Sequence, residues 1–153
     1  MAHIVLASSS PRRKELLQQL GLDFETYSPD IDESVHKNEL VHHYVERLAR
    51  EKAQTVLTLF PEAIVIAADT SLGLDGQIIG KPESKSHAFE IWKQLSGRWH
   101  DVFSGLCIAT QQQMLSQVVQ TQVEFQHLTA QDMEDYWTTG EPIGKAGGYA
   151  IQG

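Results

Sequence analysis

The first stretch of the chain combines residue types that bind phosphate with the signals of a helix start. An apolar run at 4–7 leads to three serines at 8–10, then to Pro11 and a basic cluster at 12–14. Ser10 suits a helix N-cap, and Pro11 suits the first helical position, where its missing N–H costs nothing. Free N–H groups of a first turn and guanidinium forks both favour phosphate oxygens. The stretch therefore predicts an anion site; a strand–helix junction with solvated arginines is the alternative.

Carboxylates occur at two places where they could act on a bound phosphate. The loop at 30–33 carries three of them, and Mg²⁺ takes one or two carboxylates together with substrate phosphates. A solvated acidic turn is the alternative, which we favour for the two aspartates but not for Glu33. Asp69 follows an apolar run at 63–68, typical of a strand buried on both faces. Ligands bind at the carboxyl ends of such strands, although an aspartate there can also simply cap a turn.

Two lysines are candidates for the same cleft. A helix is expected over 38–59, because apolar residues recur there at three- and four-residue steps. Lys52 lies beside that apolar stripe, and taken alone it is interpreted as a surface lysine with a buried stem. Asp75-Gly76 predicts a type I′ hairpin turn, and the returning strand leads to Lys81. On the exposed side of the helix, Arg47 and Glu51 are one turn apart and are predicted to pair.

Composition limits the function classes. The chain has 153 residues, 41% of them hydrophobic, which is enough for a core in one domain or two small lobes. A formal charge of −8 argues against a general nucleic-acid or anionic-membrane surface. The single cysteine, Cys107, lies in an apolar run and is expected to be a buried thiol. No stretch approaches the roughly eighteen apolar residues of a membrane span and no signal peptide is evident, so we expect a cytoplasmic protein.

Several kinds of catalytic site are absent from the sequence. The seven histidines show no zinc-ligand spacing, and neither a Gly-x-Ser-x-Gly elbow nor a Walker lysine loop occurs. Nucleophilic catalysis by a side chain is therefore not supported. What remains is a carboxylate acting with a metal ion and water on a phosphate that arginines and lysines hold.

The periodicity predicts alternating helices and strands, hence an α/β fold. In the first helix, Leu16, Leu17 and Leu20 are expected to form a buried face. Asp132, three residues after Thr129, indicates a capping box at the last helix. The helices are expected at 11–20, 38–59, 86–95 and 129–140, and the strands at 4–7, 24–27, 63–68, 77–80, 99–110 and 114–127.

Taken together, the motifs resemble those of the Maf family of nucleoside triphosphate pyrophosphatases, in order and spacing over the whole chain. They are Ser8-x-Ser10-Pro11-Arg12-Arg13, Arg47-Leu48-Ala49-x-x-Lys52-Ala53, Ala68-Asp69-Thr70, Gly80-Lys81-Pro82, Leu95-Ser96-Gly97 and Lys145-Ala146-Gly147-Gly148-Tyr149-x-Ile151-Gln152-Gly153. The resemblance implies one Maf-like domain over residues 1–153, with a mixed, twisted sheet flanked by helices in two lobes around a deep cleft. It also implies a fold related to the inosine triphosphate pyrophosphatases.

The resemblance further implies hydrolysis of a nucleoside triphosphate to the monophosphate and pyrophosphate, with Mg²⁺ or Mn²⁺. Asp69 is then the general base that activates water, and Glu33 and Asp69 place the metal ion. Lys52 and Lys81 assist catalysis. These two lysines hold and neutralise the triphosphate together with Ser8, Arg12 and Arg13.

Three positions bear on the choice of nucleotide. Arg12, Thr70 and Gln152 resemble the dTTP/UTP-hydrolysing branch of the family, whereas the 7-methyl-GTP branch tends to carry Trp and Gln at the first two. We therefore expect a pyrimidine substrate, and neither a nucleic-acid nor a membrane partner. The alternatives are 7-methyl-GTP hydrolysis and a catalytically weak nucleotide-binding protein that serves division and septum control.

The sequence differs from the family at its end. Family members continue for several tens of residues past the Gly-Tyr-x-Ile-Gln-Gly motif, with a further strand and helix, while this sequence stops at Gly153. Relative to the family we expect a C-terminally truncated domain, as a truncated gene product, a gene-model boundary or a chain that a partner completes. The missing strand and helix predict an exposed apolar sheet edge. A homodimer that covers this surface is the expected arrangement.

Overall fold

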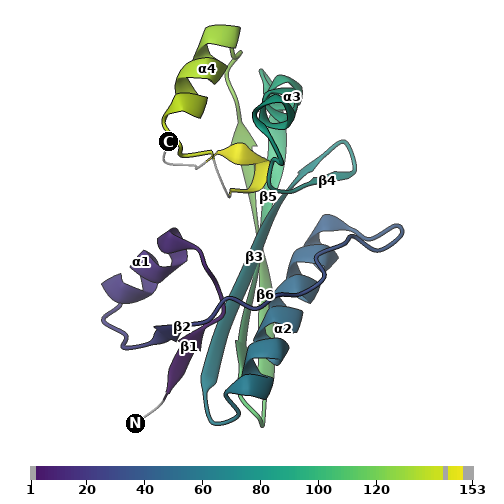
Figure 1. The fold of residues 1–153 in the computed structure, drawn as a ribbon. Coiled ribbons are helices and arrows are strands. Elements are labelled where there is room, and N and C mark those ends of the chain that lie inside the picture. Colours follow the sequence, from purple (N-terminus) through teal and green to yellow (C-terminus); the bar gives the residue numbers. More distant parts are fainter. Residues whose placement is uncertain (1–2, 143–144, 150–153) are drawn as a thin grey trace. The chain divides into compact units, whose positions relative to one another are not determined.

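The computed structural model describes residues 3–142 and 145–149, which form a mixed sheet with helices (Figure 1). Three long strands each contribute residues to two compact units, which are described separately below. The first unit comprises Met1–Asp69 and Ser104–Val119, and the second comprises Thr70–Phe103 and Gln120–Gly153. None of the described helices is long and apolar enough to cross a membrane.

The six described strands run in the order β2-β1-β3-β5-β6, and β4 pairs with β3. β1 is parallel to both β2 and β3, whereas β3 and β4 are antiparallel, so the predicted mixed sheet is confirmed. The strands are β1 (Ile4–Leu6), β2 (Glu25–Thr26), β3 (Ile64–Leu74), β4 (Gln77–Ile79), β5 (Trp99–Ala109) and β6 (Met114–Glu124). The helices are α1 (Pro11–Gln19), α2 (Val41–Leu59), α3 (Lys85–Leu95) and α4 (Ala130–Thr138), with a short 3₁₀ helix η1 (Ala146–Gly148).

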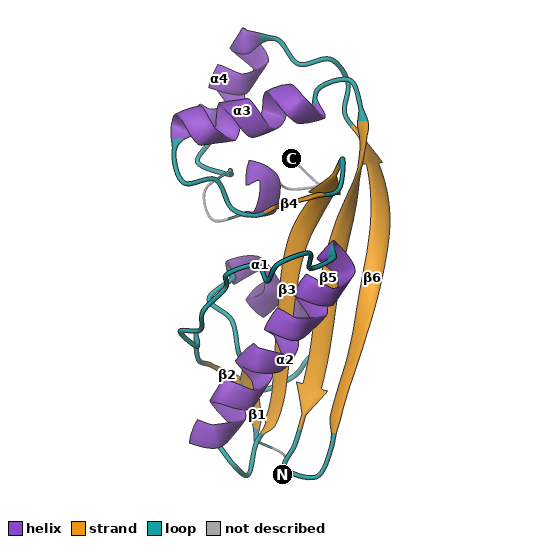
Figure 2. Ribbon diagram, turned by 90° about the vertical axis from the view of Figure 1, so that its right-hand side faces the viewer, coloured by secondary structure: helices purple, strands orange, loops and turns teal. Residues whose placement is uncertain are grey.

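The first unit is built on the packing of α2 against the sheet, along which it runs in Figure 2. Small side chains of α2, Ala49 and Ala53, are buried against strand residues such as Cys107 and let the helix approach closely. The closest approach is at Gly105 of β5, where a Cβ atom would lie 2.3 Å from the carbonyl oxygen of Val45. The thiol of Cys107 is buried as predicted.

The first helix begins as predicted, but its buried face was predicted wrongly. The Ser10 side chain accepts a hydrogen bond from the Arg13 amide at 3.3 Å, and Pro11 occupies the first turn. No residue of α1 is buried, however, and Leu16 and Leu20 are exposed. The described part of the first unit has α2 on the sheet but no element that covers these leucines. The spacing of apolar residues predicts a helix face that can be buried. It does not show whether another element covers that face.

The second helix, by contrast, begins later than its periodicity predicts. Asn38 has a φ of 61°, in the left-handed region, so the chain cannot be helical there and α2 begins at Val41. The residues before it therefore belong to a loop, which runs from 27 to 40 without a helix or strand. This loop carries Glu33.

The second unit has its own apolar core beneath α3 and α4, which lie side by side in Figure 2. Trp92 of α3 is buried there, and its indole N–H donates to the carbonyl of Gly147 at 2.9 Å. The predicted capping box of α4 is present, with Thr129 and Asp132 each accepting from the other's amide. Asp75 and Gly76 both have positive φ, as the predicted type I′ turn requires.

Candidate active site

Asp69 lies inside a strand rather than at its end, which corrects the prediction. β3 pairs with β1 as far as Leu6 and Ile66, and with β4 from Leu72 onward. Beyond Asp69 the strand continues to its pairing with β4, and Ser71, Leu72 and Leu74 are buried along it. Asp69 thus sits between the two pairings, just past the point where the parallel neighbour β1 leaves the sheet. The carboxylate still lies where a parallel strand ends and its chain turns into a helix, the location that α/β folds use for ligands.

The turn from β1 into α1 brings Ser8 and Arg13 together. Ser8 is nearly buried, and its hydroxyl oxygen accepts from the Ser10 amide at 3.0 Å and from Nη1 of Arg13 at 3.4 Å. Burial lowers the pKa of the Arg13 guanidinium, and the charge of Asp69 opposes that change. An arginine remains protonated despite such a shift. A half-buried positive charge therefore faces the start of α1 and Asp69.

Lys52 of α2 contacts both predicted metal-binding carboxylates. Its Nζ lies 3.0 Å from Oδ1 of Asp69 and 3.5 Å from Oε1 of Glu33. The side chain is only 14% exposed, so the interpretation as an ordinary surface lysine is wrong. The apolar stripe of α2 packs on the sheet and so turns the neighbouring Lys52 toward Asp69. Two carboxylates that are far apart in the sequence thus contact the same ammonium group.

Burial dominates the electrostatics of Asp69. Desolvation raises the pKa of its carboxyl group above the usual aspartate range, Lys52 and Arg13 lower it, and Glu33 raises it. Its second oxygen, Oδ2, is buried and has no hydrogen-bond partner among the described residues. A buried acceptor without a partner is costly unless a ligand, water or ion satisfies it. Asp69 therefore has one oxygen on Lys52 and one left to accept a proton or bind a cation.

Two carboxylates of the acidic loop make different contacts. Asp32 Oδ1 accepts from both the amide and the hydroxyl of Ser34, which makes it part of a local turn. Glu33 instead reaches Lys52. Among the described residues, no group of three or more His, Cys, Asp or Glu side chains could hold a metal ion by itself. Two carboxylates on one ammonium, with an unsatisfied oxygen beside them, fit a hard cation that takes its other ligands from phosphate and water.

The remaining predicted site residues are distributed as follows. Arg12 is exposed on α1, with Nη1 4.0 Å from Glu15. Thr70 directly follows Asp69 in β3, and Lys81 is an exposed residue after β4; both belong to the second unit. Gln152 lies outside the described residues. The roles of all the predicted site residues, these four included, stay predictions.

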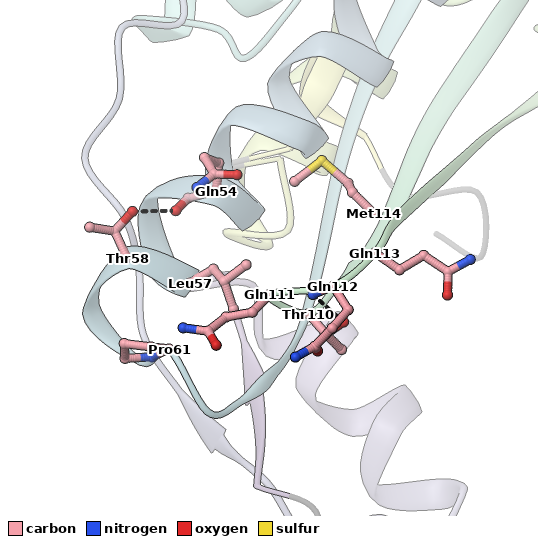
Figure 3. Close-up of a pocket in the computed structure, with 9 residues that line it drawn as sticks. All are labelled: Gln54, Leu57, Thr58, Pro61, Thr110, Gln111, Gln112, Gln113 and Met114. Carbon is pink, nitrogen blue, oxygen red and sulfur yellow. Dashed lines mark hydrogen bonds between the residues drawn. The ribbon is translucent and has the colours of Figure 1, made fainter.

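A hollow elsewhere in the first unit has a different chemical character (Figure 3). Its lining residues carry amide, hydroxyl, thioether and aliphatic groups, and none has a titratable side chain. They are Gln54, Leu57, Thr58, Pro61, Thr110, Gln111, Gln112, Gln113 and Met114. This hollow can offer hydrogen bonds but no acid–base chemistry, so the candidate active site is the cluster around Asp69.

Sequence reasoning missed the contacts that two α2 residues make with the loop near the site. Tyr44 fits the apolar periodicity of α2 and is buried, yet its hydroxyl donates to the backbone carbonyl of Glu33 at 2.5 Å. The predicted pair of Arg47 with Glu51 is present, but Arg47 also binds Glu39 and the loop backbone. The spacing within a helix reveals neighbours one turn away and gives no signal for contacts to a loop.

Comparisons with known proteins agree on the family. The family model described as "Maf-like protein" matches residues 3–153. A curated dTTP/UTP pyrophosphatase of Acinetobacter baylyi is 69% identical over 97% of this chain and 81% of its own length. One from Salmonella typhimurium is 46% identical over all of this chain and 78% of its own length. The solved structure of the Staphylococcus aureus Ham1 protein is similar in fold, with a TM-score of 0.53 at 15% identity over 79% of this chain and 69% of its own.

Proposed function

The chain belongs to the Maf family, and we propose that it hydrolyses dTTP and UTP to the nucleoside monophosphate and pyrophosphate. The observation that supports this most directly is the buried carboxylate of Asp69, held by Lys52 at 3.0 Å with its other oxygen unsatisfied. The curated relatives, whose names give this activity, match along nearly the whole chain. The site and the relatives therefore support the same reaction.

In the proposed reaction, Asp69 takes a proton from the attacking water. Burial raises the pKa of its carboxyl group, which makes the carboxylate a stronger base than an exposed aspartate. Lys52 keeps the carboxylate ionised and offers its ammonium to the phosphate oxygens that carry charge in the transition state. Arg13, which the Ser8 hydroxyl orients, supplies a second positive charge at the start of α1. Arg12 and Lys81 complete the phosphate contacts in this proposal.

We also propose that the enzyme uses Mg²⁺ or Mn²⁺, with Glu33 and Asp69 as its protein ligands. When bound, the cation would neutralise negative charge on the triphosphate and polarise its phosphorus–oxygen bonds. Both carboxylates contact Lys52 in the structure. Cation and substrate are therefore expected to bind together, with the ammonium of Lys52 moving from the carboxylates to the phosphates.

A homodimer is proposed on the basis of an apolar sheet face in the first unit. Leu106 and Ile108 are exposed on β5, where they alternate with buried residues that face α2. On β6, at the edge of the described sheet, Leu115 and Val119 are exposed while Ser116 contacts Arg50 of α2. The four apolar side chains thus share the face away from α2. In the proposed homodimer, a second copy of the chain covers these side chains. We propose a cytoplasmic location for the protein.

The substrate proposal is tested by measuring pyrophosphate release from dTTP, UTP, CTP, GTP and 7-methyl-GTP with Mg²⁺ or Mn²⁺. We expect dTTP and UTP to be turned over in preference to the purine nucleotides. Turnover confined to 7-methyl-GTP would contradict the pyrimidine assignment but not the reaction. Nucleotide binding without release of pyrophosphate from any of the five nucleotides would contradict the proposed enzymatic activity. It would favour a nucleotide-binding protein instead.

A further inference from the structure

The loop that carries Glu33 is not held in place by apolar burial. Between residues 27 and 40, every side chain is exposed except those of Pro29, Ile31 and Glu39, which are half-buried. The apolar side chains of Val35 and Leu40 both point to solvent. A loop of this kind has little apolar contact to fix it and is expected to open locally. Something polar must therefore hold Glu33 beside Lys52.

Arg47 makes the polar contacts that meet this need. Its Nε and Nη2 bind both oxygens of Glu39, at 2.6 and 2.9 Å, and Nη2 also donates to the backbone carbonyl of Ser34 at 2.9 Å. Glu39 in turn accepts from the His36 amide at 2.9 Å. Hydrogen bonding to Arg47 lowers the pKa of Glu39 to about 2, so this carboxylate stays ionised at neutral pH. One guanidinium thus ties down the loop on the carboxyl side of Glu33.

Tyr44 completes the attachment one turn earlier on α2. Its hydroxyl donates to the backbone carbonyl of Glu33 itself, and the Arg47 guanidinium lies over its ring at 5.5 Å from the centroid. The ring is buried, and desolvation together with the charges of Asp69 and Glu33 raises the pKa of the hydroxyl to about 12. The hydroxyl therefore remains protonated and able to donate. Tyr44 and Arg47, the latter partly through Glu39, together hold the loop backbone at three points against α2.

We propose that Arg47 is a positioning residue that acts through Glu33. Arg47 fixes the loop backbone directly at Ser34 and, through Glu39, at His36. It thereby presents the Glu33 carboxylate to Lys52 and to the cation that Glu33 and Asp69 would share. This inference rests on the proposed function. Arg47 itself contacts neither Lys52 nor Asp69 in any described interaction, so its effect on the reaction is indirect.

The first test compares Arg47→Met with Arg50→Met, a matched change on the same helix. Arg50 contacts Ser116 on β6 and lies away from the loop. Hydrogen exchange of the amides at 33–37 is expected to speed up by about tenfold or more in Arg47→Met, because the loop loses its anchors, and to stay unchanged in Arg50→Met. Tyr44→Phe removes one hydroxyl and should speed up hydrogen exchange of the same amides by a smaller factor. It replaces Arg47→Met as the test variant if Arg47→Met does not fold. Unchanged exchange in both Tyr44→Phe and Arg47→Met would overturn the proposal.

The second test asks whether Arg47 acts through Glu33. The Mn²⁺ concentration that half-activates dTTP hydrolysis should rise about tenfold in Arg47→Met, the usual cost of losing a partner that orients a metal ligand. In a Glu33→Gln background the same substitution should change it less than about twofold. An equal loss in both backgrounds would overturn the proposal. Absence of hydrolysis by the unsubstituted protein would contradict the proposed function instead, and the exchange data would then decide the positioning role alone.

Discussion

At the scale of single residues, the site depends on the conflict between burial and charge at Asp69. Burial opposes ionisation of its carboxyl group, while Lys52 and Arg13 favour it. The result is a carboxylate whose pKa lies above the usual aspartate range, which makes it more basic than an exposed aspartate. Such perturbed groups in contact with a specific charge partner are typical of catalytic sites.

This balance predicts the pH dependence of the reaction. The protonated carboxyl group cannot accept a proton from water, so kcat/KM should fall as the pH falls through the pKa of Asp69, above the usual aspartate range. In Lys52→Met the pKa should rise further, because the charge that lowers it is gone. The pH profile of the unsubstituted enzyme and a carboxyl NMR titration of both proteins measure these shifts. A lower Asp69 pKa in Lys52→Met would contradict this account of the electrostatics.

At the scale of elements, the position of Lys52 depends on how closely α2 packs on the sheet. The contact at Gly105 of β5 leaves no room for a side chain against the backbone of Val45. The helix can therefore lie near enough for the lysine stem to reach Asp69 on the neighbouring strand. The same packing aligns Tyr44 and Arg47 with the loop before α2.

Gly105→Ala is expected to destabilise the fold by about 1–3 kcal/mol, as overpacking of a tight contact generally does. A Cβ atom there would lie 2.3 Å from the Val45 carbonyl oxygen, so the helix must shift. Gly80→Ala is the control, because a Cβ atom at Gly80 meets nothing within 4 Å. Urea denaturation of the two variants checks the difference. Equal stability of both would show that α2 is not held at this contact.

Local features of the elements were predictable from sequence, and tertiary ones were not. The Ser10 cap, the Asp75-Gly76 turn and the capping box at Thr129 follow from residues within three positions of each other. Asp69 lies in mid-strand because β3 continues to its pairing with β4 from Leu72 onward, and that pairing is a tertiary feature. The contact of Tyr44 with Glu33 likewise depends on the path of a loop without periodicity. The site residues were found by type and motif, but their partners required the fold.

At the scale of the whole molecule, the open question is the partner that covers the apolar sheet face. Leu106, Ile108, Leu115 and Val119 form a patch on the first unit that nothing in the described residues buries. Exposed apolar faces next to an edge strand favour association. The symmetric solution for identical chains is a dimer in which each copy covers the other's face.

Sedimentation of the protein is therefore expected to show a dimer, and Leu115→Glu should shift it to a monomer, because a charge cannot be buried in an apolar interface. Gln112→Glu, in the turn between β5 and β6, adds the same charge outside the patch and should leave the dimer intact. A monodisperse monomer for the unsubstituted chain would contradict the proposed assembly.

The most direct test of the central claim is pyrophosphate release from dTTP by the unsubstituted protein and by Asp69→Asn, with nucleotide binding measured for both. We predict turnover by the unsubstituted protein and a loss of at least about 100-fold in Asp69→Asn, the scale that a general base contributes. Nucleotide binding should remain detectable in both proteins. Turnover by Asp69→Asn close to that of the unsubstituted protein would contradict the assignment of Asp69 as the base.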